Sequence, residues 1–348
     1  MGIIQAQRSF PSGHPVSEAA ARLAVTYIEA STLDSWLSAA NTRPLAVISF
    51  GRPLPAQDAC LLVTLDLPQL DGPSMVEVWS SDQPVLTQQI NGLTVAMSGD
   101  LLMGSIGVDE LPGISLEATA CAAYRQLLRQ LRELGYPHLW RVWNYFPHIN
   151  EDRQGLERYR QFCVGRYQAL AEFLPNFPES LPASTAMGTR SGPLQIYVLA
   201  GMHPATHLGN PRQLNAYEYP DTYGPRSPSF ARATFYRSEA RSQLYIAGMA
   251  SVVGHTSRHV GLPEDQTRET IQNLRALLGY AEGAARMHFT GAQSAALYKV
   301  YVRDAAHLAK VREVLRSGPL SSEQVLFLQG EPCRKELLVE IEGLITSD

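Results

Sequence analysis

The order of strand-like and helix-like segments constrains the fold of this chain most strongly, because nearly the same order occurs twice. In the second half the segments are strand 232–237, strand 244–254, helix 265–281, strand 296–302, helix 305–316, strand 325–329 and strand 337–342. Asp265 is expected to cap the first helix, Gly318-Pro319 to end the second, and the short turn between the last two strands predicts a hairpin. This order predicts a mixed β-sheet with two helices packed on one face.

The first half repeats this pattern more loosely. Its segments are strands near 45–50, 60–66, 75–80 and 93–97, a glycine-punctuated run at 98–107, helix 115–134, strand 139–146, helix 155–174 and strand 195–201. The last strand is the counterpart of residues 338–343 at the end of the second half. We therefore expect an α/β (α+β) protein of two domains, residues 1–203 and 204–348. The order of segments repeats, but the amino acids at matching positions do not. A doubled gene and two unrelated α/β halves are therefore both compatible with the pattern.

Composition excludes several classes of protein. The length of 348 residues suits two domains, and the formal net charge of -4 lacks the basic excess of nucleic-acid-binding proteins. No run of about 18 apolar residues exists to span a membrane, and residues 1–8 lack the pattern of a signal peptide. No C-x-x-C pair or zinc signature occurs among the cysteines, and unpaired thiols fit a reducing cytoplasm. The cysteines are Cys60, Cys121, Cys163 and Cys333.

Motifs of common enzyme mechanisms are absent from the sequence. It has no G-x-S-x-G elbow, no G-x-G-x-x-G and no phosphate-binding P-loop, so we expect neither a hydrolase triad nor a nucleotide cofactor. Two histidine pairs have i, i+4 spacing, His203 with His207 and His255 with His259. They lie among Pro, Gly, Ser and Thr, where a helix is not expected. Hydrogen-bonded loop histidines are therefore a better interpretation than a metal site.

The last strand-like segment carries two carboxylates on one face. Strand alternation puts Leu337, Val339 and Ile341 on the side that packs against helices. Glu340 and Glu342 then share the other side, which lies either in solvent or in a cleft. In a cleft, loss of hydration would raise the pKa of Glu340 and let it act as a general acid.

Two further regions carry cationic and hydroxyl groups. Arg166 falls within the apolar stripe of the second helix of the first half, where a guanidinium either reaches the solvent edge or meets an anion. The proline-rich segment 203–230 is expected to be irregular, and it contains Tyr217, Tyr223 and Arg226. Arg and Tyr side chains at this density form either a packed surface loop or a site for a carboxylate.

Several segments resemble known families. Residues 244–281, a strand ending in a small-Gly motif followed by a loop, Asp-Gln-Thr-Arg and a helix, resemble the RidA (YjgF) family, and so does the closing strand 339–342. A chain with two such RidA-like, chorismate-mutase-like halves and a Tyr-rich loop resembles the chorismatases. The segments that carry this second resemblance are Arg141–Asn150, Gly155–Arg160, Tyr223–Phe230 and Cys333 to Glu340.

The resemblance implies a monomeric enzyme without metal or cofactor that removes pyruvate from chorismate. Glu340 matches the family's proton donor, which protonates the terminal methylene carbon of the enol ether. Chorismate carries two carboxylates, so two cationic clusters are expected. The candidates are Arg226 with Tyr217 or Tyr223 for one cluster, and Arg166, with Arg160 as its alternate, for the other.

Two positions bear on the ring product in that family. Cys333, counted with Glu340 as catalytic, resembles the type that forms 3-hydroxybenzoate. Ala247, which we place with Gly248 in the substrate site, instead resembles the type that forms a dihydroxylated cyclohexadiene. We therefore favour a hydroxybenzoate product, with the 3- and 4-isomers both open. In the first half Tyr197 occupies the place of Glu340, which predicts one active site per chain.

Two other functions remain compatible with the residues. The RidA-like pattern also fits an enamine or imine deaminase, which would release ammonia from 2-aminoacrylate. The Tyr- and Arg-rich segment also fits a protein that binds a carboxylate without catalysis. In the preferred interpretation the partner is the small molecule chorismate, with no nucleic acid and no membrane involved.

Overall fold

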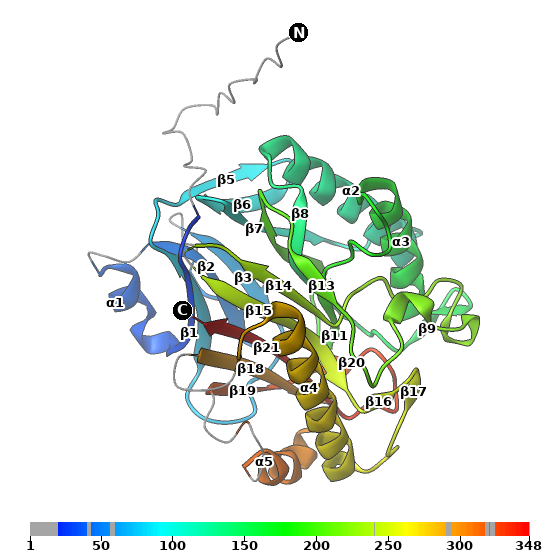
Figure 1. Ribbon diagram of the computed structural model, residues 1–348. Coiled ribbons are helices and arrows are strands. Elements are labelled where there is room, and N and C mark those ends of the chain that lie inside the picture. Colours follow the sequence, from blue (N-terminus) through cyan, green and yellow to red (C-terminus); the bar gives the residue numbers. More distant parts are fainter. Residues whose placement is uncertain are drawn as a thin grey trace.

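The computed structural model describes residues 20–39, 43–55, 60–239, 241–289, 294–316, 320 and 324–347. The expected helix end at Gly318-Pro319 and the N-terminal residues 1–8 lie outside this part of the chain. Within it the chain forms sheets of seven, six and four strands and two small two-stranded sheets. Figure 1 shows the strands gathered in the interior of the molecule and the helices on its outside.

The seven-stranded sheet is covered by two helices. Its strands lie in the order β20-β11-β8-β12-β7-β6-β5. Their bounds are β5 Leu86–Ile90, β6 Leu93–Ser98, β7 Leu101–Val108, β8 His138–Pro147, β11 Ala183–Thr189, β12 Leu194–Gly201 and β20 Glu331–Pro332. Helices α2 (Leu116–Leu134) and α3 (Arg158–Phe173) pack on this sheet through a hydrophobic core that includes Leu127, Phe162 and Val198.

The six-stranded sheet is covered in the same way. Its strands lie in the order β13-β14-β15-β21-β18-β19. Their bounds are β13 Thr206–Leu208, β14 Ala233–Arg237, β15 Ser242–Ala250, β18 Ser294–Val302, β19 Gln324–Gln329 and β21 Val339–Ser347. Helices α4 (Pro263–Ala285) and α5 (Leu308–Arg316) pack on it through a core that includes Leu274, Val311 and Ile341. Leu337, predicted on the helix-facing side of this strand, precedes β21 and packs instead in a separate small cluster with Ala250 and Val252.

The two larger sheets share one topology, as the repeated sequence pattern predicts. In each sheet the closing strand, β12 or β21, lies antiparallel between two neighbours, β7 and β8 or β15 and β18. The strands that follow the helices pair in parallel, β8 with β11 and β18 with β19. The predicted α+β class, with two helices on each of the two sheets, is therefore confirmed.

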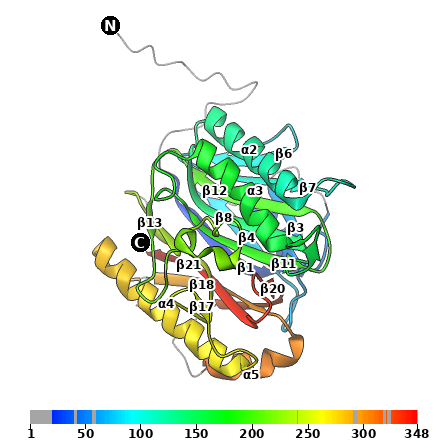
Figure 2. The same cartoon turned by 90° about the vertical axis from the view of Figure 1, so that its right-hand side faces the viewer.

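Four strands between Leu23 and Ser81 form a third sheet, which the sequence pattern does not separate from the first half. Its order is β1-β4-β2-β3. The bounds are β1 Leu23–Glu29, β2 Pro44–Phe50, β3 Leu61–Leu65 and β4 Met75–Ser81, with η1 Ala30–Thr32 and α1 Leu33–Leu37. All three sheets contribute to one central core, for example through Trp79, Trp143 and Tyr301. Figure 2 shows α2 and α3 on one side of the strands and α4 and α5 on the other.

The predicted hairpin at the end of the chain is wrong. Strand β19 pairs in parallel with β18, and β21 lies on the opposite side of β18. The connection between β19 and β21 contains β20, which pairs with β11 of the seven-stranded sheet. The strands β19 and β21 are therefore separated by β18 in the sheet and by β20 in the sequence.

Several other predicted boundaries also differ. The helix expected from Gly155 begins at Arg158, because β9 (Asp152–Arg153) and β10 (Leu156–Glu157) form a small hairpin before it. Asp265 does not cap α4, whose N-cap is Leu262 and whose first residue is Pro263. The run at 98–107 is mostly strand β7, and the sequence pattern predicts none of the strands β1, β5 and β11. The irregular segment 203–230 contains β13 and two short 3-10 helices, η2 Ala216–Glu218 and η3 Asp221–Tyr223.

Candidate active site

A cavity of about 630 Å³ is lined by residues of both larger sheets. Helix α3 and strand β11 contribute from the first half, and strands β15 and β21 contribute from the second. The proline-rich segment 203–230 and the residues 333–337 supply most of the remaining lining. The lining residues used below are Arg160, Arg166, Ser184, Gln213, Tyr219, Tyr223, Arg232, Gly248, Cys333, Arg334 and Glu340.

Glu340 is a buried acid in this cavity. Its side chain is on β21 and the residue is only 4% exposed. Its Oε1 atom lies against Gly248, where an added Cβ would be 1.8 Å away. Burial, followed by the negative charge of Glu342, raises the pKa of Glu340 to about 8, although nearby arginines lower it. The carboxyl is therefore mostly protonated near neutral pH, which is the state that a general acid needs.

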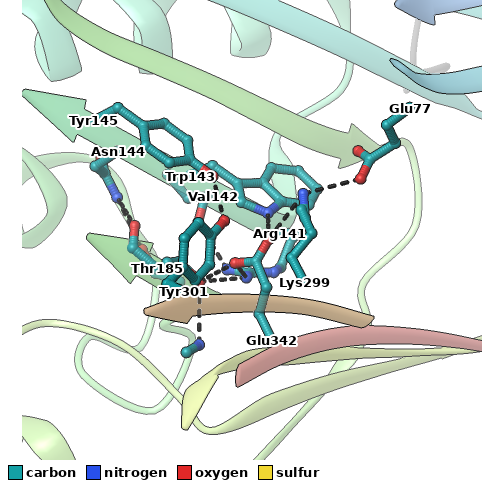
Figure 3. Close-up of polar contacts among 12 residues, drawn as sticks. Glu77, Arg141, Val142, Trp143, Asn144, Tyr145, Thr185, Lys299, Tyr301 and Glu342 are labelled. Atoms are coloured by element: carbon teal, nitrogen blue, oxygen red, sulfur yellow. Dashed lines mark hydrogen bonds and ion pairs between the residues drawn. The ribbon is translucent and has the colours of Figure 1, made fainter. Parts of the chain in front are cut away.

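Glu342, on the same face of β21 as Glu340, is held in its ionised form. The two partners that carry positive charge, Lys299 and Arg141, hold the pKa of Glu342 below its ordinary value although burial raises it. Glu342 is 1% exposed, and Figure 3 shows how polar side chains surround it. The contacts are hydrogen bonds from Arg141 (2.8 Å), Trp143 (3.1 Å) and Thr185, and an ion pair with Lys299 (2.8 Å), which also pairs with Glu77 at 3.0 Å.

Thr185 connects this charged cluster to the cavity wall. Its hydroxyl donates to Glu342 and accepts hydrogen bonds from Arg141 and from the Gly248 amide, the latter at 3.1 Å. Gly248 lies where the pairing of β15 with β21 is irregular, between Ile246 and Met249. The Thr185 hydroxyl therefore fixes the backbone segment against which Glu340 packs.

Two buried guanidinium groups face the cavity without a carboxylate partner among the described residues. Arg166 is 1% exposed and donates to the Ser184 hydroxyl at 3.2 Å, while its Nε and Nη2 have no hydrogen-bond partner. Arg232 is 5% exposed and donates to the Tyr219 hydroxyl at 2.6 Å, while its Nε has none. Buried positive charge is costly unless an anion compensates it, so this arrangement suits an anionic ligand.

Aromatic and cationic side chains also meet at Arg334. Its guanidinium lies 4.1 Å from the centre of the Tyr223 ring and 5.2 Å from that of Tyr219. Arg334 also donates to the backbone oxygen of His255 at 2.9 Å, and the His255 ring is hydrogen-bonded to the Tyr223 hydroxyl at 3.1 Å. These contacts hold a third cation beside the cavity.

Cys333 lies in the lining, and its thiol is neutral. Burial, followed by the charge of Glu340, raises the pKa of Cys333 to about 12. A thiol with this pKa carries almost no thiolate near neutral pH, so it is unsuited to act as a nucleophile. Its contribution to the cavity is therefore one of shape and polarity.

The structure brings together six of the nine residues that the sequence suggested for the site. These are Glu340, Cys333, Arg166, Arg160, Tyr223 and Gly248. Arg226 lies outside: it is exposed, with its guanidinium 4.5 Å from the centre of the Tyr167 ring. Tyr217 packs at the edge of the core of the seven-stranded sheet, and Ala247 is buried within β15. Neither lines the cavity.

Sequence reasoning missed other lining residues, among them Ser184, Gln213, Arg232 and Arg334. Ser184 lies on β11, whose small and polar residues gave no strand pattern. Arg232 was assigned to the predicted strand 232–237, so its place at the strand end, where a buried guanidinium can reach a cavity, was a usable signal.

Tyr197 and His207, considered above for a second active site and for a metal site, have other contacts in the structure. Tyr197, the residue matched to Glu340, is fully buried in the central core, 4.6 Å between ring centres from Trp143. His207 is hydrogen-bonded to Thr234 at 3.1 Å. In the described ranges no group of three or more His, Cys, Asp or Glu residues could hold a metal ion. No helix in those ranges has the length and apolar character needed to cross a membrane.

These features define an α+β protein with a buried acid in a cation-lined cavity that suits a small anionic molecule. Known proteins are similar to this chain in sequence and in fold. A family model, described as chorismatase FkbO/Hyg5-like, N-terminal, matches residues 77–200. A 3-hydroxybenzoate synthase of Streptomyces hygroscopicus is 37% identical over 77% of this chain and 81% of its own length. A chorismatase of the same organism is 36% identical over 79% of this chain and 80% of its own.

A solved structure agrees with these relatives. The crystal structure of a chorismatase superimposes with a TM-score of 0.84 at 30% identity, covering 94% of this chain and 99% of the other. The chain belongs to the chorismatase family.

Proposed function

We propose that this protein is a chorismatase that converts chorismate into a hydroxybenzoate and pyruvate. The observation that carries the proposal is Glu340, a protonated carboxylic acid in a cavity with uncompensated guanidinium groups. The relatives named 3-hydroxybenzoate synthase and chorismatase support the same substrate.

The chemistry follows from the enol ether of chorismate. The Glu340 carboxyl gives its proton to the terminal methylene carbon, and the electron pair of that double bond forms the new C–H bond. The oxocarbenium ion that results is attacked by water, and the adduct collapses to pyruvate with cleavage of the bond between the ether oxygen and the former enol carbon. Hydroxybenzoate and pyruvate together have the elemental composition of chorismate, so the water that is added is balanced by loss of water as the ring becomes aromatic.

The cations supply sites for the two carboxylates of chorismate. Arg166 is assigned to one carboxylate, because its Nε and Nη2 are buried and free to donate. Arg232, with Arg160 or Arg334 beside the same cavity, is assigned to the other. Arg226 takes no part, because it is exposed outside the cavity.

The ring product proposed for this chain is 3-hydroxybenzoate, and the 4-isomer stays open as the alternative. Cys333 resembles the residue of the 3-hydroxybenzoate-forming type, and one relative carries that product in its name. The neutral thiol of Cys333 lies in the same cavity as Glu340 and can contact the ring without forming a bond to it.

The proposal extends to the organisation of the chain. The boundary between the two halves is placed near residue 203, between β12 and β13. One active site per chain is proposed, because Tyr197 is a core residue where Glu340 is an acid. A monomer in the cytoplasm is the expected state, since one chain supplies both walls of the cavity and its described cysteines are free thiols.

The test is to incubate the protein with chorismate and to separate the products by chromatography. Release of pyruvate with 3-hydroxybenzoate supports the proposal, whereas no turnover contradicts it. Ammonia released from 2-aminoacrylate would indicate a deaminase instead, and tight binding of a benzoate without turnover would indicate a carboxylate-binding protein. Glu340→Gln should lose about 10²- to 10⁴-fold in kcat, the range of general-acid catalysis, with the fold intact. Glu172→Gln, which changes an exposed carboxylate on α3, is the matched control.

A further inference from the structure

Four buried side-chain atoms of the cavity lining lack a hydrogen-bond partner within the described chain. Three are donors on guanidinium groups: Nε and Nη2 of Arg166 and Nε of Arg232. The fourth is an acceptor, Oε1 of Gln213, a residue that is 8% exposed. A buried polar atom without a partner destabilises the folded protein, so a ligand that pairs with these four atoms in the cavity would relieve that cost.

The orientation of the Gln213 amide is determined by its surroundings. Its Nε2 donates to the backbone oxygen of Val252 at 3.0 Å. The opposite orientation would place two oxygens against each other, so the nitrogen must face Val252 and the oxygen must face away from it. The backbone is held as well, because Gln213 forms an isolated bridge with Gly254 and donates to the Asn210 oxygen at 2.9 Å. Gln213 therefore presents a fixed, neutral acceptor.

The groups of the proposed substrate match this inventory of donors and acceptors. Ionised chorismate has two carboxylates, one ether oxygen and one hydroxyl on the ring. The carboxylates and the ether are acceptors only, so they cannot pair with an amide oxygen. The hydroxyl is the one donor of the molecule. The guanidinium groups, in turn, donate only and suit the carboxylates.

We propose that Gln213 is a specificity-determining residue whose Oε1 accepts a hydrogen bond from the ring hydroxyl of the substrate. This inference rests on the proposed function, since it takes chorismate as the substrate. The contact selects hydroxylated cyclohexadiene enol ethers over related dicarboxylates that lack the hydroxyl. It also fixes the rotation of the ring between the two cationic sites, and with it the side of the enol ether that faces Glu340.

The variant that tests this role is Gln213→Met, which keeps the length of the side chain and removes the acceptor. The Val252 oxygen keeps a second donor in this variant, Nδ2 of Asn273 at 2.9 Å, so no backbone group loses its last partner. Gln130→Met is the matched control, because Gln130 is 9% exposed on α2, outside the cavity lining.

Two ligands separate the proposed contact from a general effect on the site. One is chorismate, and the other is 3-(1-carboxyvinyloxy)benzoate, which has both carboxylates and the enol ether but no ring hydroxyl. Dissociation constants are measured by calorimetry in a Glu340→Gln background, where turnover does not consume the ligand. Gln213→Met should weaken chorismate binding about 10-fold and change binding of the benzoate less than about 2-fold. In the active enzyme kcat/KM for chorismate should fall by a similar factor, while Gln130→Met changes none of these values.

Equal loss for both ligands would overturn the proposal, because it would mean that Gln213 acts only on the shape of the cavity. Unchanged binding of chorismate would overturn it too. Should Gln213→Met fail to fold, the protein with native Gln213 still decides the matter: it must bind chorismate more tightly than the benzoate, and a preference for the benzoate contradicts the contact. Failure of the proposed function is recognised separately, as absence of pyruvate release by the unmodified protein, and leaves the comparison of the two ligands intact.

Discussion

Replacing Gly248 with alanine should displace the proposed acid without unfolding the protein. A Cβ at this position would lie 1.8 Å from Oε1 and 2.8 Å from Cδ of Glu340, whereas real Cβ atoms essentially never approach within 3.0 Å. The carboxyl must therefore retreat by about 1.2 Å or more. No other neighbouring group needs to move as far, because the three nearest atoms to the new Cβ all belong to Glu340.

The magnitude follows from this distance. The carboxyl is the end of a flexible side chain beside a cavity of about 630 Å³, so it can turn away at small cost in stability. A misplacement of roughly 1 Å in a reacting group costs about 10²-fold in rate. We expect Gly248→Ala to lower kcat about 100-fold, which corresponds to about 2.7 kcal/mol. The free energy of unfolding should change by less than about 1 kcal/mol.

The assay couples pyruvate release from chorismate to lactate dehydrogenase and follows the absorbance of NADH, with urea unfolding measured in parallel. Gly283→Ala is the matched control, since it makes the same change on α4 where no atom lies within 4 Å of the new Cβ. It should keep full activity and gain a little stability, as Gly to Ala does within a helix. Full activity of Gly248→Ala would refute the reasoning, and so would an activity loss explained by unfolding.

The remaining predictions concern groups that support the acid and the anion site. The Ser184 hydroxyl accepts hydrogen bonds from Arg166 (3.2 Å) and Asn144 (3.0 Å), so its own proton is left to donate into the cavity. Ser184→Ala should therefore raise KM for chorismate about 10-fold, with a smaller effect on kcat. Steady-state kinetics check this, and an unchanged KM contradicts it. Because the charge of Glu342 helps to raise the pKa of Glu340, Glu342→Gln should lower that pKa. The protonated acid is required, so the alkaline fall of kcat, expected near pH 8 in the unmodified protein, should move to lower pH; a fall that stays in place in the pH–rate profile contradicts the role of Glu342.

Periodicity predicts the repeated architecture well, because the spacing of apolar residues within a single segment is enough to tell a strand from a helix. The apolar stripe of α2 and the alternation along β21 report which side of each element packs on the core, and the structure agrees with both. Pairing between strands was harder, as the hairpin of β19 and β21 shows. Sequence neighbours pair often, but here the connection contains β20, whose partner β11 lies in the other sheet. The local pattern carries no information about such a partner.

The site was predictable where a residue contradicted its own element. Arg166 is a cation within an apolar helix stripe, and it lies buried in the cavity lining. Arg226 belonged to a segment without periodicity, so nothing in the sequence indicated which way its side chain points, and it stacks on Tyr167 at the surface. Gln213 could not be predicted from the sequence, for another reason. Its relevance lies in an unpaired oxygen, which only the positions of its neighbours reveal.

Glu340 and Glu342 illustrate why a strand face predicts burial but not ionisation. Both are almost fully buried on β21, and burial favours the neutral form of each, yet the pKa of Glu340 is raised whereas that of Glu342 is lowered. The difference comes from partners far apart in the sequence: Lys299 and Arg141 are in direct contact with Glu342, whereas no described residue forms an ion pair with Glu340. The charge of Glu342 then acts on Glu340 to favour its neutral form. Burial thus keeps Glu340 protonated, and the negative charge of Glu342 adds to this effect. That charge is maintained by one cation from each half of the chain, Arg141 and Lys299.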